Sequence, residues 1–84
     1  MKLLFEDRYG RYREVAEVAN RQAAATAIQD FLKQFNYKSY YTRIWIRENE
    51  DSGVFYVMYD VGSHTEFFSI PFLSYAAAKK FLEE

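Results

Sequence analysis

The 84-residue sequence predicts a single α+β domain, residues 1–84, folded as a two-layer sandwich with two helices packed on one face of a mostly antiparallel sheet. Three observations support this prediction. Half of the residues are hydrophobic, which is enough for one core, and the length leaves no room for a second domain. Short apolar segments are separated by polar turns that contain glycine. Two other segments repeat their apolar residues every three to four positions, as an amphipathic helix does.

The predicted elements follow the order β-β-α-β-β-β-α. Five segments are expected to be strands, namely 2–6, 11–18, 40–48, 54–61 and 66–70. Two segments are expected to be helices, namely 21–35 and 75–83. Gly10, Gly53 and Gly62 lie in the turns between strands. Pro71 is expected to stop the sheet because proline has no backbone N–H to donate.

Residues 11–18 fit either a strand or the start of a helix. The alternation in residues 11–18 is imperfect, so a helix that begins at Glu14 is the competing interpretation. We prefer a strand because Asn20 is a good N-cap and the best helical periodicity starts after it.

The ends of the two predicted helices have their own signals. Asn36 is expected to cap the end of the helix at 21–35, and Ser74 the start of the helix at 75–83. The helix residues expected to face the core are Ala24, Ala27, Ile28, Phe31, Leu32, Phe35, Ala78, Phe81 and Leu82.

The composition argues against several classes of protein. The net charge is −1, whereas domains that bind nucleic-acid phosphates are usually basic. The chain has no cysteine, which rules out disulfides, zinc–thiolate sites and cysteine nucleophiles. No run of 18 apolar residues and no signal-peptide pattern occur, so we expect a cytoplasmic protein with no membrane partner.

No catalytic or cofactor-binding pattern stands out. His64 is the only histidine, and it follows Ser63 in a predicted turn, where adjacent side chains point apart. We therefore expect His64 to be exposed rather than catalytic. The three glycines are isolated, which gives no phosphate-binding loop. The sequence predicts a protein that is not an enzyme and holds no cofactor.

The acidic residues suggest no metal site either. Glu48, Glu50 and Asp51 lack the alternating spacing of a calcium loop and are expected to form a solvated hairpin tip. Asp60 falls within the most apolar strand, where a half-buried carboxylate needs a partner. We expect it to face solvent at the end of its strand or to bond Thr42.

Aromatic residues make up 20% of the chain, with eight Tyr, eight Phe and one Trp, which is more than one small core requires. The predicted pairing of the third and fourth strands sets two cross-strand pairs, Trp45 with Val57 and Arg43 with Tyr59. Two short helices cover one face of a five-stranded sheet, so the other face is expected to be exposed and aromatic-rich, which is typical of a partner surface. The residues expected to bind a partner are Tyr41, Arg43, Trp45, Arg47 and Tyr59. In two alternative arrangements the same residues belong to the hydrophobic core. In the first, one helix lies on each face of the sheet, and in the second, the first hairpin folds over the sheet.

These features predict a small non-enzymatic binding protein that acts through protein–protein interaction. We expect a homodimer that uses this face or the adjacent sheet edge to bind a protein partner, which it could inhibit. Trp, Tyr and Arg are the residue types that dominate binding hot spots. The alternative is a weak nucleic-acid-binding module on the same face, because alternating aromatic and basic side chains can stack on bases and neutralise phosphates.

Two resemblances bear on this hypothesis. Residues 21–84 resemble a double-stranded-RNA-binding domain in their α-β-β-β-α order, which implies the same fold class. Where that family carries a lysine-rich motif, the last helix starts with Ser74, Tyr75, Ala76, Ala77 and Ala78. Lysines follow only at positions 79 and 80, so we transfer no function from this family. The chain also resembles the small cysteine-free accessory proteins of bacteriophages and other mobile elements, many of which inhibit host proteins.

Overall fold

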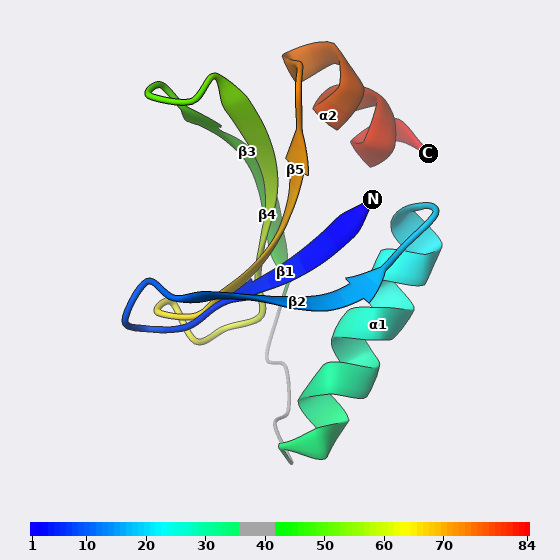
Figure 1. The fold of residues 1–84 in the computed structure, drawn as a ribbon. Helices are drawn as coiled ribbons and strands as arrows, with labels where there is room; N and C mark the ends of the chain where they lie inside the picture. Colours follow the sequence, from blue (N-terminus) through cyan, green and yellow to red (C-terminus); the bar gives the residue numbers. More distant parts are fainter. Residues whose placement is uncertain (36–41) are drawn as a thin grey trace.

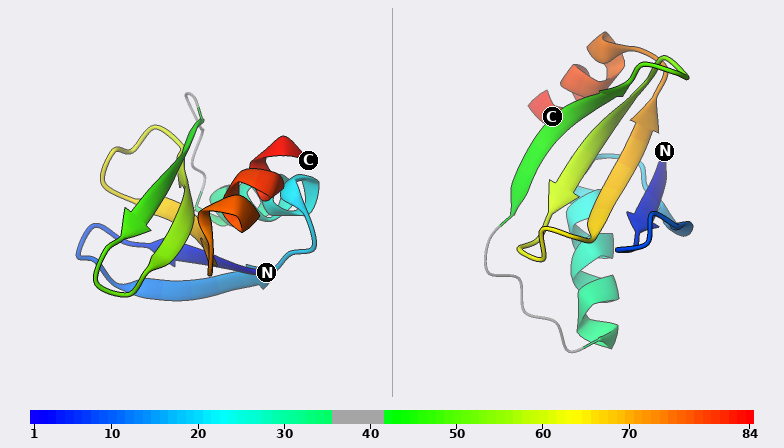
Figure 2. Two further views of the ribbon diagram at one scale, coloured as in Figure 1. Left: turned by 90° about the horizontal axis from the view of Figure 1, so that it is seen from above. Right: turned by 90° about the vertical axis from the view of Figure 1, so that its left-hand side faces the viewer.

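A computed structural model describes residues 1–35 and 42–84, and it has the predicted order of elements (Figure 1). The strands are β1 (Lys2–Glu6), β2 (Tyr12–Glu17), β3 (Arg43–Asn49), β4 (Val54–Asp60) and β5 (Phe67–Phe72). They form one antiparallel sheet in the order β2-β1-β5-β4-β3. Helices α1 (Arg21–Gln34) and α2 (Tyr75–Glu83) lie on the same side of this sheet (Figure 2). The α+β class, the order of elements and the packing of the helices on one face are therefore confirmed.

Both helices begin at the predicted cap residues. The side chain of Asn20 accepts a hydrogen bond from the backbone N–H of Ala23 at 2.8 Å, and Ser74 Oγ accepts one from the N–H of Ala77 at 3.1 Å. Each bond satisfies an N–H group of the first helical turn that has no partner within the helix. The predicted cap at Asn36 lies outside the described residues.

The hairpin of β1 and β2 contains a β-bulge. Leu3 pairs with Ala16, whereas Leu4 pairs with Glu14, so Val15 is the extra residue of β2. A bulge interrupts the regular alternation of side chains, which explains why this segment also fits a helical pattern. The preferred strand is confirmed, and the competing helix from Glu14 does not form.

Strand β5 continues past the proline that was expected to end it at Ile70. Pro71 pairs with Tyr56 of β4, and the strand ends at Phe72. Pairing of β5 with β1 ends at Ser69, so Pro71 lies where β5 has a neighbouring strand on one side only. A free strand side tolerates a residue without an N–H group, which is why the prediction was wrong here.

The register of β3 and β4 also differs from the predicted one. Asn49 pairs with Val54, and Trp45 consequently lies opposite Met58. A shift of one residue moves every side chain of β4 to the other face of the sheet. Tyr59 therefore packs under the helices with 3% of its surface exposed, and it does not lie beside the β3 arginines.

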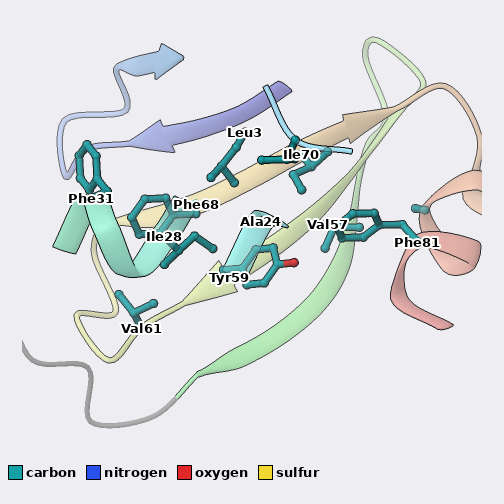
Figure 3. Packing of buried hydrophobic residues seen from close by; sticks show 12 residues of the cluster. Leu3, Ala24, Ile28, Phe31, Val57, Tyr59, Val61, Phe68, Ile70 and Phe81 are labelled. Atoms are coloured by element: carbon teal, nitrogen blue, oxygen red, sulfur yellow. The ribbon is translucent and has the colours of Figure 1, made fainter. Parts of the chain in front are cut away.

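The main core lies between the sheet and the helices (Figure 3). Its buried members are Leu3, Val18, Ala24, Ile28, Phe31, Val57, Tyr59, Val61, Phe68, Ile70, Ala78 and Phe81. Ala27, Leu32 and Leu82 are partly buried against this cluster, as expected for the inner faces of the two helices. Phe35 was also expected in the core, but it follows the last residue of α1 and is 60% exposed.

Candidate functional site

The sheet face turned away from the helices carries a group of arginine and aromatic side chains. Side chains alternate along a strand, and Ile44 and Ile46 pack against the main core, so the residues beside them point to the other face. Cross-strand pairing brings β4 and β5 side chains to the same face. We call this group the arginine–aromatic face, and its members are Arg43, Trp45, Arg47, Tyr56 and Phe67.

The members of this face form two stacked pairs and one edge-on contact. The guanidinium carbon of Arg43 lies 4.7 Å from the ring centroid of Trp45, and that of Arg47 lies 5.7 Å from the ring centroid of Tyr56. Phe67 meets Trp45 edge-on, with the centroids 5.9 Å apart and the rings at 90°. Cation–π pairs of this kind hold the arginine side chains along the strand surface while their charges stay accessible.

The sheet curves so strongly that its two edge strands approach each other over this face (Figure 2). Arg47 of β3 donates a hydrogen bond from Nη2 to the hydroxyl of Tyr12 of β2 at 3.4 Å. At the centre of the face, Met58 and Ser69 are 0% and 1% exposed. The prediction of an exposed face is therefore wrong at its centre, where Met58 and Ser69 are buried. The exposed part is the rim along β3.

Strand β3 presents a regular open edge. All seven of its residues pair with β4 without a shift in register, and no strand in the described part of the chain pairs with its outer side. The opposite edge strand, β2, is interrupted by the bulge at Val15, a common protection against pairing with other chains. Arg43 and Arg47 are exposed, and neither forms an ion pair within residues 1–35 and 42–84. Their backbones lie four residues apart, which is about 13 Å along a strand.

The structure brings together three of the five residues expected to bind a partner, namely Arg43, Trp45 and Arg47. Tyr41 lies outside the described residues. Tyr59 is a correction, because the observed register buries it on the helix side of the sheet. Sequence reasoning missed the positions of Tyr56 and Phe67 on this face, and the correct pairing of β3 with β4 would have revealed Tyr56.

Asp60, at the end of β4, organises the turn that follows. It is 3% exposed, and its Oδ1 accepts hydrogen bonds from the N–H groups of Gly62 at 2.9 Å and His64 at 3.3 Å. Nδ1 of His64 lies 3.0 Å from the other carboxylate oxygen. Burial raises the pKa of Asp60, but these hydrogen bonds and His64 outweigh burial and hold the pKa below its ordinary value. The carboxylate neither faces solvent nor bonds Thr42, which corrects the expectation, whereas His64 is exposed as predicted.

The same turn uses the hydroxyl of Ser63. It donates to the carbonyl oxygen of Glu66 at 2.8 Å and accepts from the N–H of Glu66 at 3.0 Å.

Across the residues that the structure describes, no three His, Cys, Asp or Glu side chains gather closely enough to hold a metal ion. Neither of the described helices has the length and apolar composition that crossing a membrane requires.

Comparisons of the chain with models of protein families, with curated protein sequences and with solved structures gave no match. A functional assignment therefore has to rest on the geometry of the chain itself.

Proposed function

We propose that this protein is a non-enzymatic binding domain that accepts an extended segment of a partner protein along the open edge of β3. The observation that carries the proposal is found in one regular edge strand, which within residues 1–35 and 42–84 has a free backbone edge and two exposed arginines without ion pairs. Inhibition of the partner is one consequence that such binding can have.

The chemistry of the edge indicates what the partner segment carries. An added strand forms main-chain hydrogen bonds with β3, and its side chains lie about 5 Å from those of the β3 residues they face. Carboxylates opposite Arg43 and Arg47 would make charge-assisted hydrogen bonds with the guanidinium groups. We therefore expect a partner strand with Asp or Glu four positions apart and an apolar residue between them, opposite Trp45.

A second copy of the chain fits this edge less well. Antiparallel pairing of two β3 strands about Trp45 would set Arg43 of each copy opposite Arg47 of the other. Like charges directly opposite each other destabilise a strand pair. A different protein is therefore the partner that we propose, in preference to the homodimer expected from the sequence.

The nucleic-acid alternative has less support from the geometry. A base would have to stack on an aromatic ring, but the guanidinium group of Arg43 lies over the ring of Trp45 and Arg47 lies over Tyr56. Stacking of bases would require these arginines to move away. The alternative makes its own prediction, which is binding to single-stranded oligonucleotides that weakens steeply with salt.

A displayed library of random peptides tests the proposal. Selected peptides are titrated against the protein, and the fluorescence of Trp45, the only tryptophan, reports binding at this edge. We expect Arg43→Gln and Arg47→Gln each to weaken binding about tenfold, since a hydrogen bond to a charged group contributes about 1.5–3 kcal/mol. Arg8→Gln is the matched control, because Arg8 is an exposed arginine that pairs with Glu66 away from β3.

Methylation of backbone nitrogens in a selected peptide separates strand addition from docking by side chains alone. In a strand, alternate N–H groups point toward the neighbouring strand. Methyl groups on one alternate set should abolish binding, while the other set should leave it nearly unchanged. Equal binding of both methylated peptides, or equal binding to the parent and both arginine variants, would refute the proposal. Selection of no peptide together with salt-dependent oligonucleotide binding would favour the alternative.

A further inference from the structure

A pocket of about 530 Å³ opens at the C-terminal end of α1, on the helix side of the sheet. It lies between α1, the β1–β2 hairpin and the turn that follows β4. Figure 3 shows Phe31, Phe68 and Val61 together at this end of the core. The apolar lining consists of Phe5, Phe31, Leu32, Phe35, Val61 and Phe68. This volume is within the range of small-molecule sites.

Four phenylalanine rings form one connected wall of the pocket. Phe5 lies 4.9 Å from Phe31 and 5.3 Å from Phe68, measured between ring centroids. Phe31 meets Phe68 edge-on at 5.4 Å and lies 5.0 Å from Phe35. Phe31 and Phe68 are buried, but Phe35 leaves 60% of its surface to solvent. Phe35 therefore extends the buried cluster to the surface, and a lining made mainly of hydrophobic and aromatic side chains is typical of small-molecule sites.

Among the charged lining residues that the structure describes, one has no ion pair. The other charged lining residues are in ion pairs, Asp7 with Arg11 at 3.5 Å and Glu66 with Arg8 at 3.7 Å. Arg13 has no ion pair in the described part of the chain, and its guanidinium carbon lies 5.2 Å from the ring centroid of Phe31. Arg13 pairs with Phe5 across the hairpin, which fixes its backbone beside the apolar wall. Within the described residues, the pocket therefore joins an apolar surface to one arginine without an ion pair.

We infer that this pocket binds a small amphipathic carboxylate. The apolar part of the ligand lies against the lining residues Leu32 and Phe35, and its carboxylate accepts hydrogen bonds from the guanidinium of Arg13. A planar guanidinium matches a carboxylate with two parallel hydrogen bonds, which a neutral or cationic ligand cannot use. No residue of β3 lines the pocket, and Tyr12 is the link between the two sites, because it lines the pocket and its hydroxyl accepts the hydrogen bond from Arg47. The inference uses neither the open edge of β3 nor its arginines, so it does not depend on the proposed function.

Octanoate and its neutral analogue octanamide are suitable probes. Each is titrated against the ¹⁵N-labelled full chain, and the amide shifts of the pocket residues give the dissociation constant. We expect octanoate to bind about tenfold more tightly than octanamide, as one hydrogen-bonded charge pair contributes. The shifts should cluster at the lining of the pocket and leave β3 unchanged, except at Arg47, which is hydrogen-bonded to the lining residue Tyr12.

Two variants separate the roles of charge and apolar surface. Arg13→Gln should remove the preference for octanoate and leave octanamide binding unchanged, with Arg8→Gln as the control that keeps the preference. Phe35→Ala should weaken both ligands, and since Phe35 is largely exposed the variant should still fold. The inference is wrong if octanoate causes no shifts at about 10 mM, a concentration that detects even weak ligands. It is also wrong if Arg13→Gln binds octanoate as well as the parent does.

Discussion

Replacement of Asp60 should show that this buried carboxylate holds the turn between β4 and β5. Asp60→Ala leaves the N–H groups of Gly62 and His64 without their acceptor in a partly buried turn. A hydrogen bond to a charged acceptor contributes about 1.5–3 kcal/mol. The bond from His64, at 3.3 Å, is long for an N–H···O bond and should contribute less than the bond from Gly62. We therefore expect the free energy of unfolding to fall by about 3 kcal/mol in total. A domain of this size has few kilocalories to lose.

Asp60→Asn keeps a neutral acceptor and isolates the contribution of the charge. Neutral acceptors contribute about 1 kcal/mol less per bond, so this variant should lose about 1–2 kcal/mol at pH 7. The folded pKa of Asp60 lies below its ordinary value of 3.8, so the stability due to the ionised form is complete above about pH 5. That stability falls as the pH drops through 3.8 toward the folded pKa. The difference between the parent and Asp60→Asn should therefore shrink below about pH 4.

Urea unfolding followed by Trp45 fluorescence at a series of pH values gives these free energies. Asp51→Asn is the control, because Asp51 is an exposed aspartate in the turn between β3 and β4. The reasoning is refuted if Asp60→Asn is as stable as the parent at pH 7. It is also refuted if the difference in unfolding free energy stays constant down to about pH 2.

Three further substitutions test the packing of the core, the cap of α2 and a buried hydroxyl group. Phe68→Ala removes a ring that is 1% exposed and contacts the rings of Phe5 and Phe31. It should lower the free energy of unfolding by about 3–5 kcal/mol, and circular dichroism would then show partial or complete unfolding at 25 °C. Ser74→Ala should cost about 1 kcal/mol and lower the melting temperature by about 4–8 °C, and an unchanged melting temperature would contradict the capping role. Tyr59→Phe should be neutral or stabilising in urea unfolding, because the buried hydroxyl has no hydrogen-bond partner among the described residues; a loss above about 1 kcal/mol would reveal one.

Signals that act within a few residues were predictable from the sequence. Asn20 and Ser74 bond to N–H groups three positions along the chain, so their roles follow from local order alone. The alternation of Arg43, Trp45 and Arg47 put these three side chains on one face for the same reason, because a strand has a period of two. The order of strands and helices along the chain, and with it the α+β class, follows from the same local patterns.

The error in the β3–β4 register arose because a difference of one residue in a turn has consequences across the sheet. The carbonyl oxygen of Asn49 accepts a hydrogen bond from the N–H of Gly53 at 2.8 Å, and its side chain accepts from the N–H of Asp51 at 3.1 Å. These bonds hold Asn49 opposite Val54, so β3 ends one residue later than predicted. As a result, Tyr59 lies on the helix side of the sheet and Tyr56 lies on the arginine–aromatic face. The pattern of β4, which is apolar on both faces, contained nothing to distinguish the two registers.

By itself, the sequence determined the order of the elements, the N-caps of both helices and the alternation of side chains along β3, because these depend on neighbours within one or two turns of the chain. The tertiary structure decided which side chains meet. Arg47 and Tyr12 are 35 residues apart, and only the curvature of the sheet brings them together. Phe5, Phe31 and Phe68 likewise come from β1, α1 and β5, so the pocket beside Arg13 exists only in the folded chain. Contacts of this kind depend on register, curvature and packing, which arise when distant segments are placed against one another and are not encoded in any one of them.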